Sequence, residues 1–299
     1  MDEPRRSAFG VAFDLLRCSQ WVKNVFVFGA LVFGNALLVP EKAKAALLAF
    51  VLFCAVTSAA YIHNDVSDLE IDRLHPRKRM RPLAAGIVSV ATARVVQAAL
   101  LVVGVGGAAL FLPRILPLLI GYVLLNVLYS GVLKQLLLLD VMAIAVGFVI
   151  RVEAGCEAVE IDPSVWIVLC TFVLALFLAL GKRRHELLEM AAVGAVNGGN
   201  GRATYTTEFL EQTMTIASAV TIVCYAMFSR APETLEVHGT RSLIYTIPFV
   251  VYGLFRYQWL TYDGEGRGDP GEIVFTDRPL QATIALWIAA CVAIVYLKW

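Results

Sequence analysis

The chain has 299 residues, of which 59% are apolar and 16% charged, and its mean hydropathy is +0.73. A water-soluble domain cannot carry so much apolar surface, so the composition excludes soluble enzymes and binding modules and indicates an integral membrane protein. The formal net charge of +1 says little, because the charged residues fall in short segments between long apolar runs. We therefore expect the lipid bilayer, and no nucleic acid, as a partner.

Apolar stretches long enough to cross about 30 Å of hydrocarbon occur nine times along the chain. They lie near residues 24–39, 43–63, 90–112, 115–133, 136–155, 164–181, 213–229, 242–260 and 280–298. This pattern predicts an all-α integral membrane bundle of nine transmembrane helices in a single domain, residues 1–299. The two longest polar connections, residues 64–89 and 182–212, follow the second and the sixth span, so both emerge on the same side of the membrane.

The distribution of positive charge predicts the orientation of this bundle. Eighteen Lys and Arg residues lie at the N-terminus and in every second loop after it, and seven lie on the opposite side. Loops rich in Lys and Arg stay in the cytoplasm. The bias therefore predicts a cytoplasmic N-terminus and, with nine spans, an outside C-terminus. Both long polar connections would then face the cytoplasm at the inner (plasma) membrane.

The six cysteines are scattered along the chain and form no CxxC pair. They are Cys18, Cys54, Cys156, Cys170, Cys224 and Cys291. Most of them lie inside apolar runs, where cysteine commonly serves as a small packing residue. We therefore expect free thiols packed between helices rather than a disulfide or metal framework.

At the predicted cytoplasmic end of the second span, Asn64 is followed by Asp65, Asp68 and Asp72. On a helix these aspartates stand at i, i+3 and i+7, so three carboxylates and one amide share a face within two turns. A single aspartate there would be explained by a solvated helix end. Three carboxylates repel one another unless a cation lies between them, and hard oxygen ligands suit Mg²⁺ that is completed by substrate phosphate. The spacing predicts a magnesium site made of these four residues, with the aspartates in catalytic roles.

A basic run follows the acidic cluster directly and contains Arg73, Arg77 and Arg81, the last of which precedes Pro82. Alone, such a run is equally typical of an orientation signal or of contact with anionic lipid. Beside a magnesium site it predicts the cationic half of a phosphate clamp. The three arginines would bind substrate there, and Arg81 is the first candidate.

The sixth span ends in a second charged segment, which contains Lys182, Arg183, Glu186 and Glu189. If the helix continues, Lys182, Glu186 and Glu189 share one face, so that a phosphate-binding cation stands beside two carboxylates that could ligate a second metal. We expect Lys182 in a catalytic role and Arg183 and Glu186 at the substrate. A positive-inside stop signal closed by salt bridges is the alternative interpretation.

Three further helix ends on the same side carry polar residues with a possible role at a phosphate. These substrate-binding candidates are Tyr129 and Lys134 at the end of the fourth span, Lys23 and Asn24 at the start of the first, and Arg278 before the ninth. An aromatic-belt tyrosine with a snorkelling lysine, or a plain connector, explains such residues equally well.

The fifth predicted span contains Asp140 and Arg151. Charged groups at membrane depth are costly, so both should face the bundle interior rather than lipid. We expect Arg151 to lock the bundle and Asp140, which is nearer the cytoplasm, to support the substrate site.

The acidic cluster, Asn64-Asp65-x-x-Asp68-x-x-x-Asp72, resembles the first aspartate motif of the UbiA superfamily of intramembrane prenyltransferases, and the nine predicted spans agree with it. The resemblance extends over nearly the whole chain. It is also carried by Gln20-Trp21-Val22-Lys23-Asn24, Arg81-Pro82-Leu83-Ala84-Ala85-Gly86, Leu139-Asp140, Gly181-Lys182-Arg183-Arg184 and Asp277-Arg278-Pro279. It implies a UbiA-type bundle and a Mg²⁺-dependent transferase.

The charged segment after the sixth span decides which branch the chain resembles most. Quinone and haem prenyltransferases usually present a second aspartate-rich motif there, whereas this chain has Lys182, Arg183 and Glu186. The departure suits a substrate with an additional phosphate. The resemblance is closest to the branch that transfers 5-phosphoribosyl from phosphoribosyl pyrophosphate to a polyprenyl, decaprenyl-type phosphate. It implies release of pyrophosphate and a product used for cell-envelope polysaccharide such as arabinan.

Two other functions remain open on the sequence. An aromatic prenyltransferase would use the same acidic cluster to ionise a polyprenyl diphosphate and would alkylate a quinone or haem precursor. A transporter of an anionic lipid or solute would also place basic residues at helix ends, although their clustering at one face rather than at the midplane speaks against it. The lipid chain length, the number of magnesium ions and the formation of a homo-oligomer are left undecided.

Overall fold

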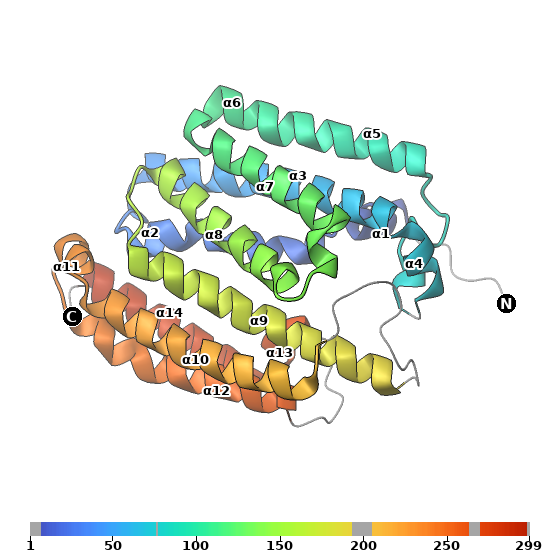
Figure 1. The fold of residues 1–299 in the computed structure, drawn as a ribbon. Coiled ribbons are helices and arrows are strands. Elements are labelled where there is room, and N and C mark those ends of the chain that lie inside the picture. The colour runs from blue at the N-terminus through green and yellow to red at the C-terminus, as the bar shows by residue number, and fades with distance from the viewer. Residues whose placement is uncertain (1–6, 76, 193–204, 263–269, 298–299) are drawn as a thin grey trace. The chain divides into compact units, whose positions relative to one another are not determined.

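The computed structural model describes residues 7–75, 77–192, 205–262 and 270–297 (Figure 1). Within these ranges every regular element is helical, as the sequence predicts. The chain groups into two compact units. The first comprises Met1–Leu31, Val39–Val132 and Ile150–Glu160, and the second comprises Val32–Leu38, Leu133–Val149 and Ile161–Trp299. Each unit has its own apolar core, and the single domain expected over residues 1–299 stays a prediction.

The first unit is built around α3 (Pro40–Ser67), which begins with a proline at its first position after the extended Val39. Proline suits that position because the first helical amides have no partner inside the helix. Much of α3 is buried in an apolar core. This core consists of Val27, Ala49, Leu52, Phe53, Val56, Ala108, Ile115, Leu119, Tyr122, Ala154 and Ala158. The α3 helix therefore forms the centre of the unit and carries its polar end to the edge.

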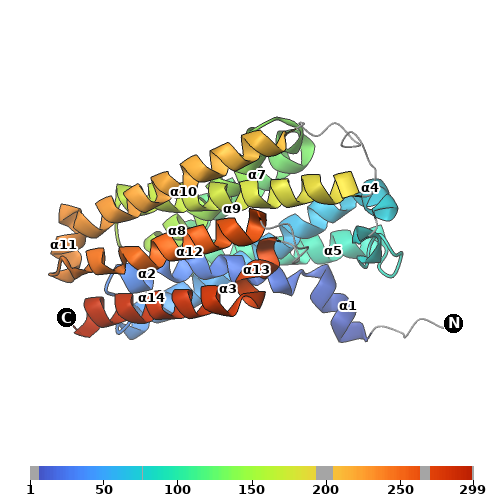
Figure 2. The same cartoon turned by 90° about the horizontal axis from the view of Figure 1, so that it is seen from below.

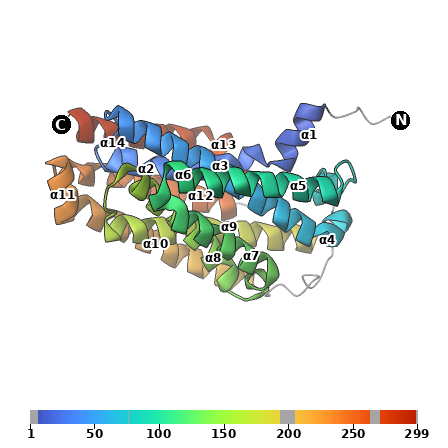
Figure 3. The same ribbon diagram turned by 90° about the horizontal axis from the view of Figure 1, so that it is seen from above.

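A helical rod packs along α3, as Figure 3 shows. It is formed by α5 (Val90–Leu101), the π-helix η3 (Val102–Gly106) and α6 (Gly107–Phe111). Ser89 caps the rod by accepting a hydrogen bond from the Thr92 amide at 3.1 Å. A Cβ atom on Gly104 would stand 2.5 Å from Val56 Cγ2, so glycine is what allows the rod to approach α3 closely.

The remaining elements of the first unit are α1 (Ala8–Leu15), the 3₁₀ helix η1 (Cys18–Phe28), the start of α2 (Gly29–Phe33), α4 (Leu69–Leu74), η2 (Lys78–Met80), η4 (Pro113–Ile115) and α7 (Leu116–Gly131). Of these elements, η1, α4 and α7 contact α3. Trp21 of η1 donates a hydrogen bond from Nε1 to Ser58 Oγ of α3 at 3.0 Å. This contact attaches the N-terminal segment to the central helix.

The second unit contains two pairs of long helices. The α9 helix (Val165–Ala192) packs against α10 (Thr207–Arg230), and α12 (Ile247–Tyr262) packs against α14 (Arg278–Leu297), as Figure 2 shows. Between α10 and α12 lie α11 (Pro232–His238) and η6 (Ser242–Thr246), and between α12 and α14 lies α13 (Pro270–Thr276). The unit also contains η5 (Leu133–Gln135), which precedes α8. The α8 helix (Leu139–Val159) begins in the second unit and ends in the first.

Six of the described helical segments are long and apolar enough to cross a membrane. They are Pro40–Ser67, Val90–Phe111, Pro113–Gly131, Val165–Glu189, Thr207–Arg230 and Arg278–Leu297. The chain is therefore a multi-pass membrane protein.

The other three predicted spans also correspond to helices. Residues 24–39 overlap η1 and α2, residues 136–155 overlap α8, and residues 242–260 overlap η6 and α12. The first of these is a short apolar segment, Cys18–Phe33, and α12 has 16 residues, whereas α8 carries four ionisable side chains. The count of nine crossings and the orientation of the termini stay predictions.

Candidate functional site

The acidic cluster lies where α3 ends and α4 begins. The chain leaves the α3 geometry at Asp68, but helical hydrogen bonding continues from the Asp68 amide to Asn64 O at 2.9 Å and from the Asp72 amide to Asp68 O at 2.8 Å. The three aspartates therefore keep the helical spacing that the sequence predicts. Asp65, Asp68 and Asp72 are only 4%, 7% and 2% exposed. Buried carboxylates require cationic or hydrogen-bonding partners.

Arg81 supplies one such partner. Its Nη1 atom donates to Asp65 Oδ1 at 3.0 Å and to Asp72 Oδ2 at 2.5 Å, so one guanidinium nitrogen joins two carboxylates. The backbone of Arg81 is extended at the end of η2 and precedes Pro82, and its amide donates to Lys78 O at 3.0 Å. This turn directs Arg81 back toward the helix end that precedes it in the chain.

Arg17 is the second partner, and the sequence analysis did not include it among the site residues. Its Nη2 atom donates to Asp65 Oδ1, and its guanidinium lies 5.0 Å from the centre of the Tyr61 ring. Its backbone is left-handed, with φ 50° and ψ 48°, a conformation that costs about 1 kcal/mol for a residue other than glycine. The side-chain contacts compensate for this strain. The sequence shows that Arg17 is a basic residue shortly before Gln20-Trp21. It does not show the left-handed backbone conformation that Arg17 adopts.

The amide of the acidic cluster contacts a neighbouring helix end. Asn64 Oδ1 accepts a hydrogen bond from Ser130 Oγ at 3.1 Å, and Ser130 is next to the half-buried Tyr129 at the end of α7. The structure thus brings the end of α7 to the end of α3. Arg73 and Arg77 are exposed, and Arg73 pairs with Glu70 at 2.9 Å.

The donor set of the cluster fits a divalent cation. Within the described residues, no three His, Cys, Asp or Glu side chains are close enough together to hold a metal ion as they stand. The Arg81 nitrogen between Asp65 and Asp72 nevertheless shows that one positive centre can lie between these two carboxylates. Carboxylate oxygens beside an amide are the ligands that Mg²⁺ prefers. Asp65 and Asp72 would hold such an ion, after Arg81 has moved.

Lys23 and Asn24, predicted together, have different surroundings. Lys23 is half-buried on η1, whereas Asn24 is fully buried. The Asn24 amide donates to Thr57 Oγ1 at 3.1 Å and accepts from Arg151 Nε at 2.8 Å. Arg151 also donates to the Tyr122 hydroxyl at 2.8 Å. The structure therefore places Asn24 in a buried polar network within the first unit, where Arg151 connects helices as expected.

A second polar cluster lies in the second unit and centres on Asp140. Asp140 is 3% exposed and accepts from Arg183 Nε at 2.6 Å and from the Tyr205 hydroxyl at 2.5 Å. Arg183 Nη1 also donates to Glu186 at 2.5 Å, and the Tyr205 hydroxyl accepts from the Leu138 amide at 2.9 Å. The predicted residues Asp140, Arg183 and Glu186 thus lie together.

Tyr205 is a part of this second cluster that sequence reasoning missed. Burial and the hydrogen bond to Asp140 raise the pKa of the Tyr205 phenol well above its usual range. The Tyr205 hydroxyl is therefore a protonated donor at neutral pH, and it holds Asp140 in place as an acceptor for Arg183. No local pattern in the sequence indicates a tyrosine that lies 65 residues from its carboxylate partner.

The remaining predicted residues of the second unit are more exposed. Lys182 is exposed on α9. This helix continues through Lys182 and Glu189, which is the condition for Lys182, Glu186 and Glu189 to share one helix face. Lys134 is half-buried in η5, and Arg278 is exposed at the start of α14. The neighbouring charge pair instead joins Asp277 to Arg256, with Nη2 and Oδ2 2.9 Å apart.

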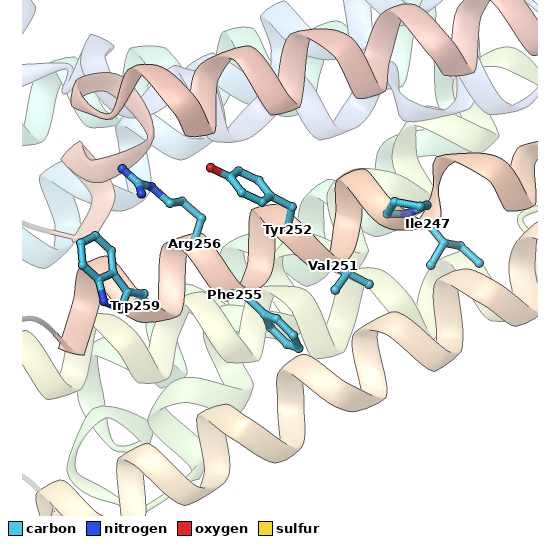
Figure 4. A pocket seen from close by; sticks show the side chains of 7 residues that line it. Ile247, Val251, Tyr252, Phe255, Arg256 and Trp259 are labelled. Carbon is cyan, nitrogen blue, oxygen red and sulfur yellow. The ribbon is translucent and has the colours of Figure 1, made fainter.

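An open groove of about 500 Å³ runs along α12 (Figure 4). Figure 4 shows Tyr252 and Arg256 on one side of the helix and Val251 and Phe255 on the other. The groove is almost entirely apolar, so it suits lipid contact rather than chemistry.

Comparison with known proteins agrees with the predicted fold and family. A model of the UbiA prenyltransferase family matches residues 25–270. Decaprenyl-phosphate phosphoribosyltransferase of Mycobacterium tuberculosis is 33% identical over 92% of this chain and 90% of that protein. The protein of the same name from Corynebacterium glutamicum is 33% identical over 98% of this chain and 89% of that protein.

Among solved structures, a UbiA homolog from Archaeoglobus fulgidus bound to GPP and Mg²⁺ has the same fold. The two chains superpose with a TM-score of 0.74 at 21% identity, and the match covers 95% of this chain and 99% of the other. The helical architecture is therefore of the UbiA type.

Proposed function

The chain belongs to the UbiA prenyltransferase family and is a transferase, and from this membership we propose that it transfers 5-phosphoribosyl from phosphoribosyl pyrophosphate to a polyprenyl, decaprenyl-type phosphate. The observation that carries the proposal is the similarity to two decaprenyl-phosphate phosphoribosyltransferases over about nine-tenths of their lengths. The reaction breaks the bond between the ribose anomeric carbon and pyrophosphate. It forms a bond from that carbon to an oxygen of the lipid phosphate.

The acidic cluster would serve the leaving diphosphate. Asp65 and Asp72, with Asp68 and Asn64 beside them, would hold Mg²⁺, which supplies Lewis-acid neutralisation of the negative charge that develops as the diphosphate departs. Two observations support this assignment: the carboxylates are buried, and a single cationic nitrogen already lies between two of them. Arg81, Arg73 and Arg77 would then neutralise the remaining phosphate charge.

The basic residues that follow the sixth span would bind the donor's additional phosphate. Lys182 is exposed on α9, and the adjacent Arg183 is oriented by Asp140 and Glu186. Such orientation suits recognition of a phosphate, because a guanidinium binds an anion best when its plane is fixed. We assign the lipid phosphate to Lys23, Lys134 and Arg278 as a group, with Tyr129 as an additional donor.

The acceptor needs little activation. A lipid phosphate is already an anionic nucleophile at neutral pH, so a general base is not required, and Asp72 would act as a metal ligand rather than as a base. The anomeric carbon should acquire oxocarbenium character as pyrophosphate leaves. The membrane setting follows from the substrates, since a polyprenyl tail requires hydrocarbon while phosphoribosyl pyrophosphate is water-soluble. We place the reaction at the cytoplasmic face of the inner membrane, in the synthesis of cell-envelope polysaccharide.

Substitution of the acidic cluster tests the proposal. Transfer from labelled phosphoribosyl pyrophosphate to decaprenyl phosphate should fall at least about a hundredfold in Asp65→Asn and Asp72→Asn, because each ligand supports several kcal/mol of charge stabilisation. Asp162→Asn is the matched control, since Asp162 is exposed and outside the cluster. Chelation of Mg²⁺ should abolish transfer, and added Mg²⁺ should restore it.

The donor itself is tested with the same purified protein. A polyprenyl diphosphate offered with an aromatic acceptor should release no pyrophosphate above background. Release from that pair, without release from phosphoribosyl pyrophosphate and lipid phosphate, would establish an aromatic prenyltransferase instead. Full activity of both aspartate variants would remove the metal assignment.

A further inference from the structure

Two arginines share one buried carboxylate oxygen in the first unit. Arg17 Nη2 and Arg81 Nη1 both donate to Asp65 Oδ1, and Arg81 Nη1 also donates to Asp72 Oδ2. The carboxylate side chains are 5% and 3% exposed, whereas those of Arg17 and Arg81 are 18% and 27% exposed. Two guanidinium charges thus balance two carboxylates. The arginines reach solvent, and the aspartates do not.

This arrangement has a consequence for a divalent cation. An ion that bridged Asp65 and Asp72 where Arg81 Nη1 now lies would use Asp65 Oδ1 and Asp72 Oδ2, the two oxygens that accept the guanidinium hydrogen bonds. The guanidinium groups and the ion therefore compete for these two oxygens. Like charges at such distances also repel one another strongly in a partly buried site. A metal ion at these two oxygens therefore requires Arg17 to move away from Asp65, and Arg81 to move away from Asp65 and Asp72.

A displaced guanidinium requires another anion. An unpaired charge in a poorly solvated position is unfavourable, and diphosphate is a better partner for a guanidinium than neutral protein groups are. Arg17 also has a second contact that does not depend on Asp65, because its guanidinium lies 5.0 Å from the centre of the Tyr61 ring. It can leave the carboxylate and stay beside the site.

From these contacts we propose that Arg17 is an exchangeable counter-ion of the metal site. It neutralises Asp65 when metal is absent and passes to the diphosphate when metal arrives. Metal and diphosphate then bind as coupled ligands, each raising the affinity for the other. Arg81 makes the same exchange from Asp65 and Asp72. The inference rests on the proposed function of the acidic cluster and adds to it a residue that the acidic motif does not contain.

The coupling predicts effects of opposite sign for one substitution. Arg17→Gln removes one of the two competitors of the metal and leaves Arg81, so Mn²⁺ alone, detected by electron paramagnetic resonance, should bind at least about fivefold more tightly than in the wild type. The same variant has lost a ligand of the diphosphate, so labelled pyrophosphate in saturating Mg²⁺ should bind at least about fivefold more weakly. A purely structural ion pair would not change the two affinities in opposite directions.

The design uses full-length protein in detergent, with gel filtration and thermal unfolding to verify folding. Arg94→Gln is the matched control, because Arg94 is exposed and contacts His63 and Gln97 rather than a carboxylate. Arg17→Lys keeps the charge and should bind Mn²⁺ more nearly as the wild type does. Equal or weaker Mn²⁺ binding in folded Arg17→Gln would overturn the exchange.

The wild-type protein supplies a measurement that needs no variant. In equilibrium dialysis at equal free Mn²⁺, the ion should be retained at least about fivefold more strongly when pyrophosphate is present. Retention that is independent of pyrophosphate would also overturn the exchange. Asp65→Asn separates the metal assignment from the exchange. If Asp65→Asn does not weaken Mn²⁺ retention, the metal assignment itself fails. If Asp65→Asn weakens Mn²⁺ retention but Arg17→Gln binds Mn²⁺ as the wild type does, only the exchange is rejected.

Discussion

Arg151 is a buried charge within α8, with 4% of its surface exposed. It donates from Nε to Asn24 and from Nη2 to the Tyr122 hydroxyl, and its guanidinium lies 4.7 Å from the centre of the Tyr122 ring. Asn24 in turn donates to Thr57 and to Cys54. This network joins η1, α3, α7 and α8 through a single guanidinium. A charged group so deep is retained at a cost, which points to a role in fixing the helices.

Replacement of Arg151 by Gln should destabilise the protein by about 2–4 kcal/mol, because buried acceptors lose their charged donor and keep their desolvation cost. Thermal unfolding in detergent measures the change. Arg114→Gln is the control, since Arg114 and Glu160 are mostly exposed with 3.5 Å between their charged atoms, and such a pair contributes about 1 kcal/mol at most. Equal stability of the two variants would contradict a structural role of the network.

The site residues differ in how far the sequence could predict them. The i, i+3, i+7 spacing of Asp65, Asp68 and Asp72 is a local property, and the structure keeps it across the break between α3 and α4. Pairing partners from distant segments are not local. Arg17 reaches Asp65 from 48 residues away, and Tyr205 reaches Asp140 from 65 residues away. Neither pairing leaves a periodic signal, so only the three-dimensional arrangement reveals it.

Helix packing at Gly155 has no room for a side chain. A Cβ atom at this position of α8 would stand 2.1 Å from the carbonyl oxygen of Val27 in η1. Backbone atoms cannot rotate aside as a flexible side chain does, so the helices would have to separate. Gly155 therefore sets the distance between these two elements in the first unit.

Gly155→Ala should lower stability by about 2 kcal/mol or more, because an added methyl group in a closed contact forces backbone shifts. Gly121→Ala in α7 is the matched control, since no atom lies within 4 Å of a Cβ atom built there. It should be neutral or stabilising by about 0.5–1 kcal/mol, as alanine is the better helix former. Thermal unfolding of both variants in the same detergent tests the contrast, which a loss of stability in Gly121→Ala alone would contradict.

At the level of elements, hydropathy locates helices well but misjudges their ends. The span predicted at residues 164–181 is observed as α9, which continues to Ala192. An apolar run identifies only the part of a helix that can lie in hydrocarbon. It does not identify the charged continuation of α9 through Lys182 and Glu189. In contrast, the span predicted at residues 24–39 is divided between η1 and α2. Asn35, which follows α2 within this predicted span, has a left-handed φ of 51°.

At the level of the whole molecule, the exposed surface identifies the solvent. Val95, Val102, Leu110 and Phe111 on α5, η3 and α6 are between 68% and 78% exposed. Contiguous apolar side chains of this size do not face water in a stable soluble protein. In a bilayer these side chains contact lipid hydrocarbon, which is as apolar as they are. The helices are then held together by close packing at small residues such as Gly104 and by buried hydrogen bonds. Composition therefore predicts the environment, while the number of crossings depends on each helix separately.

The number of crossings can be tested through the C-terminus. The excess of Lys and Arg on one side, eighteen against seven, predicts a cytoplasmic N-terminus, and nine crossings then place the C-terminus outside. Alkaline phosphatase fused after Trp299 should therefore be active, and a green fluorescent protein fused there should be dark. The opposite pair of results would mean an even number of crossings, so that either one or all three of the segments η1–α2, α8 and α12 do not cross.

Fusions at internal positions then identify the segment concerned. A reporter placed after α7 should lie in the cytoplasm, and one placed after α8, near Asp162, should lie outside. Since α8 carries Asp140 and Arg151, it crosses only if both charges are satisfied by protein, as their hydrogen bonds to Arg183, Asn24 and Tyr122 allow. Arg151→Gln should therefore leave the topology of this reporter unchanged while it lowers stability, because removing a charge makes insertion easier, not harder.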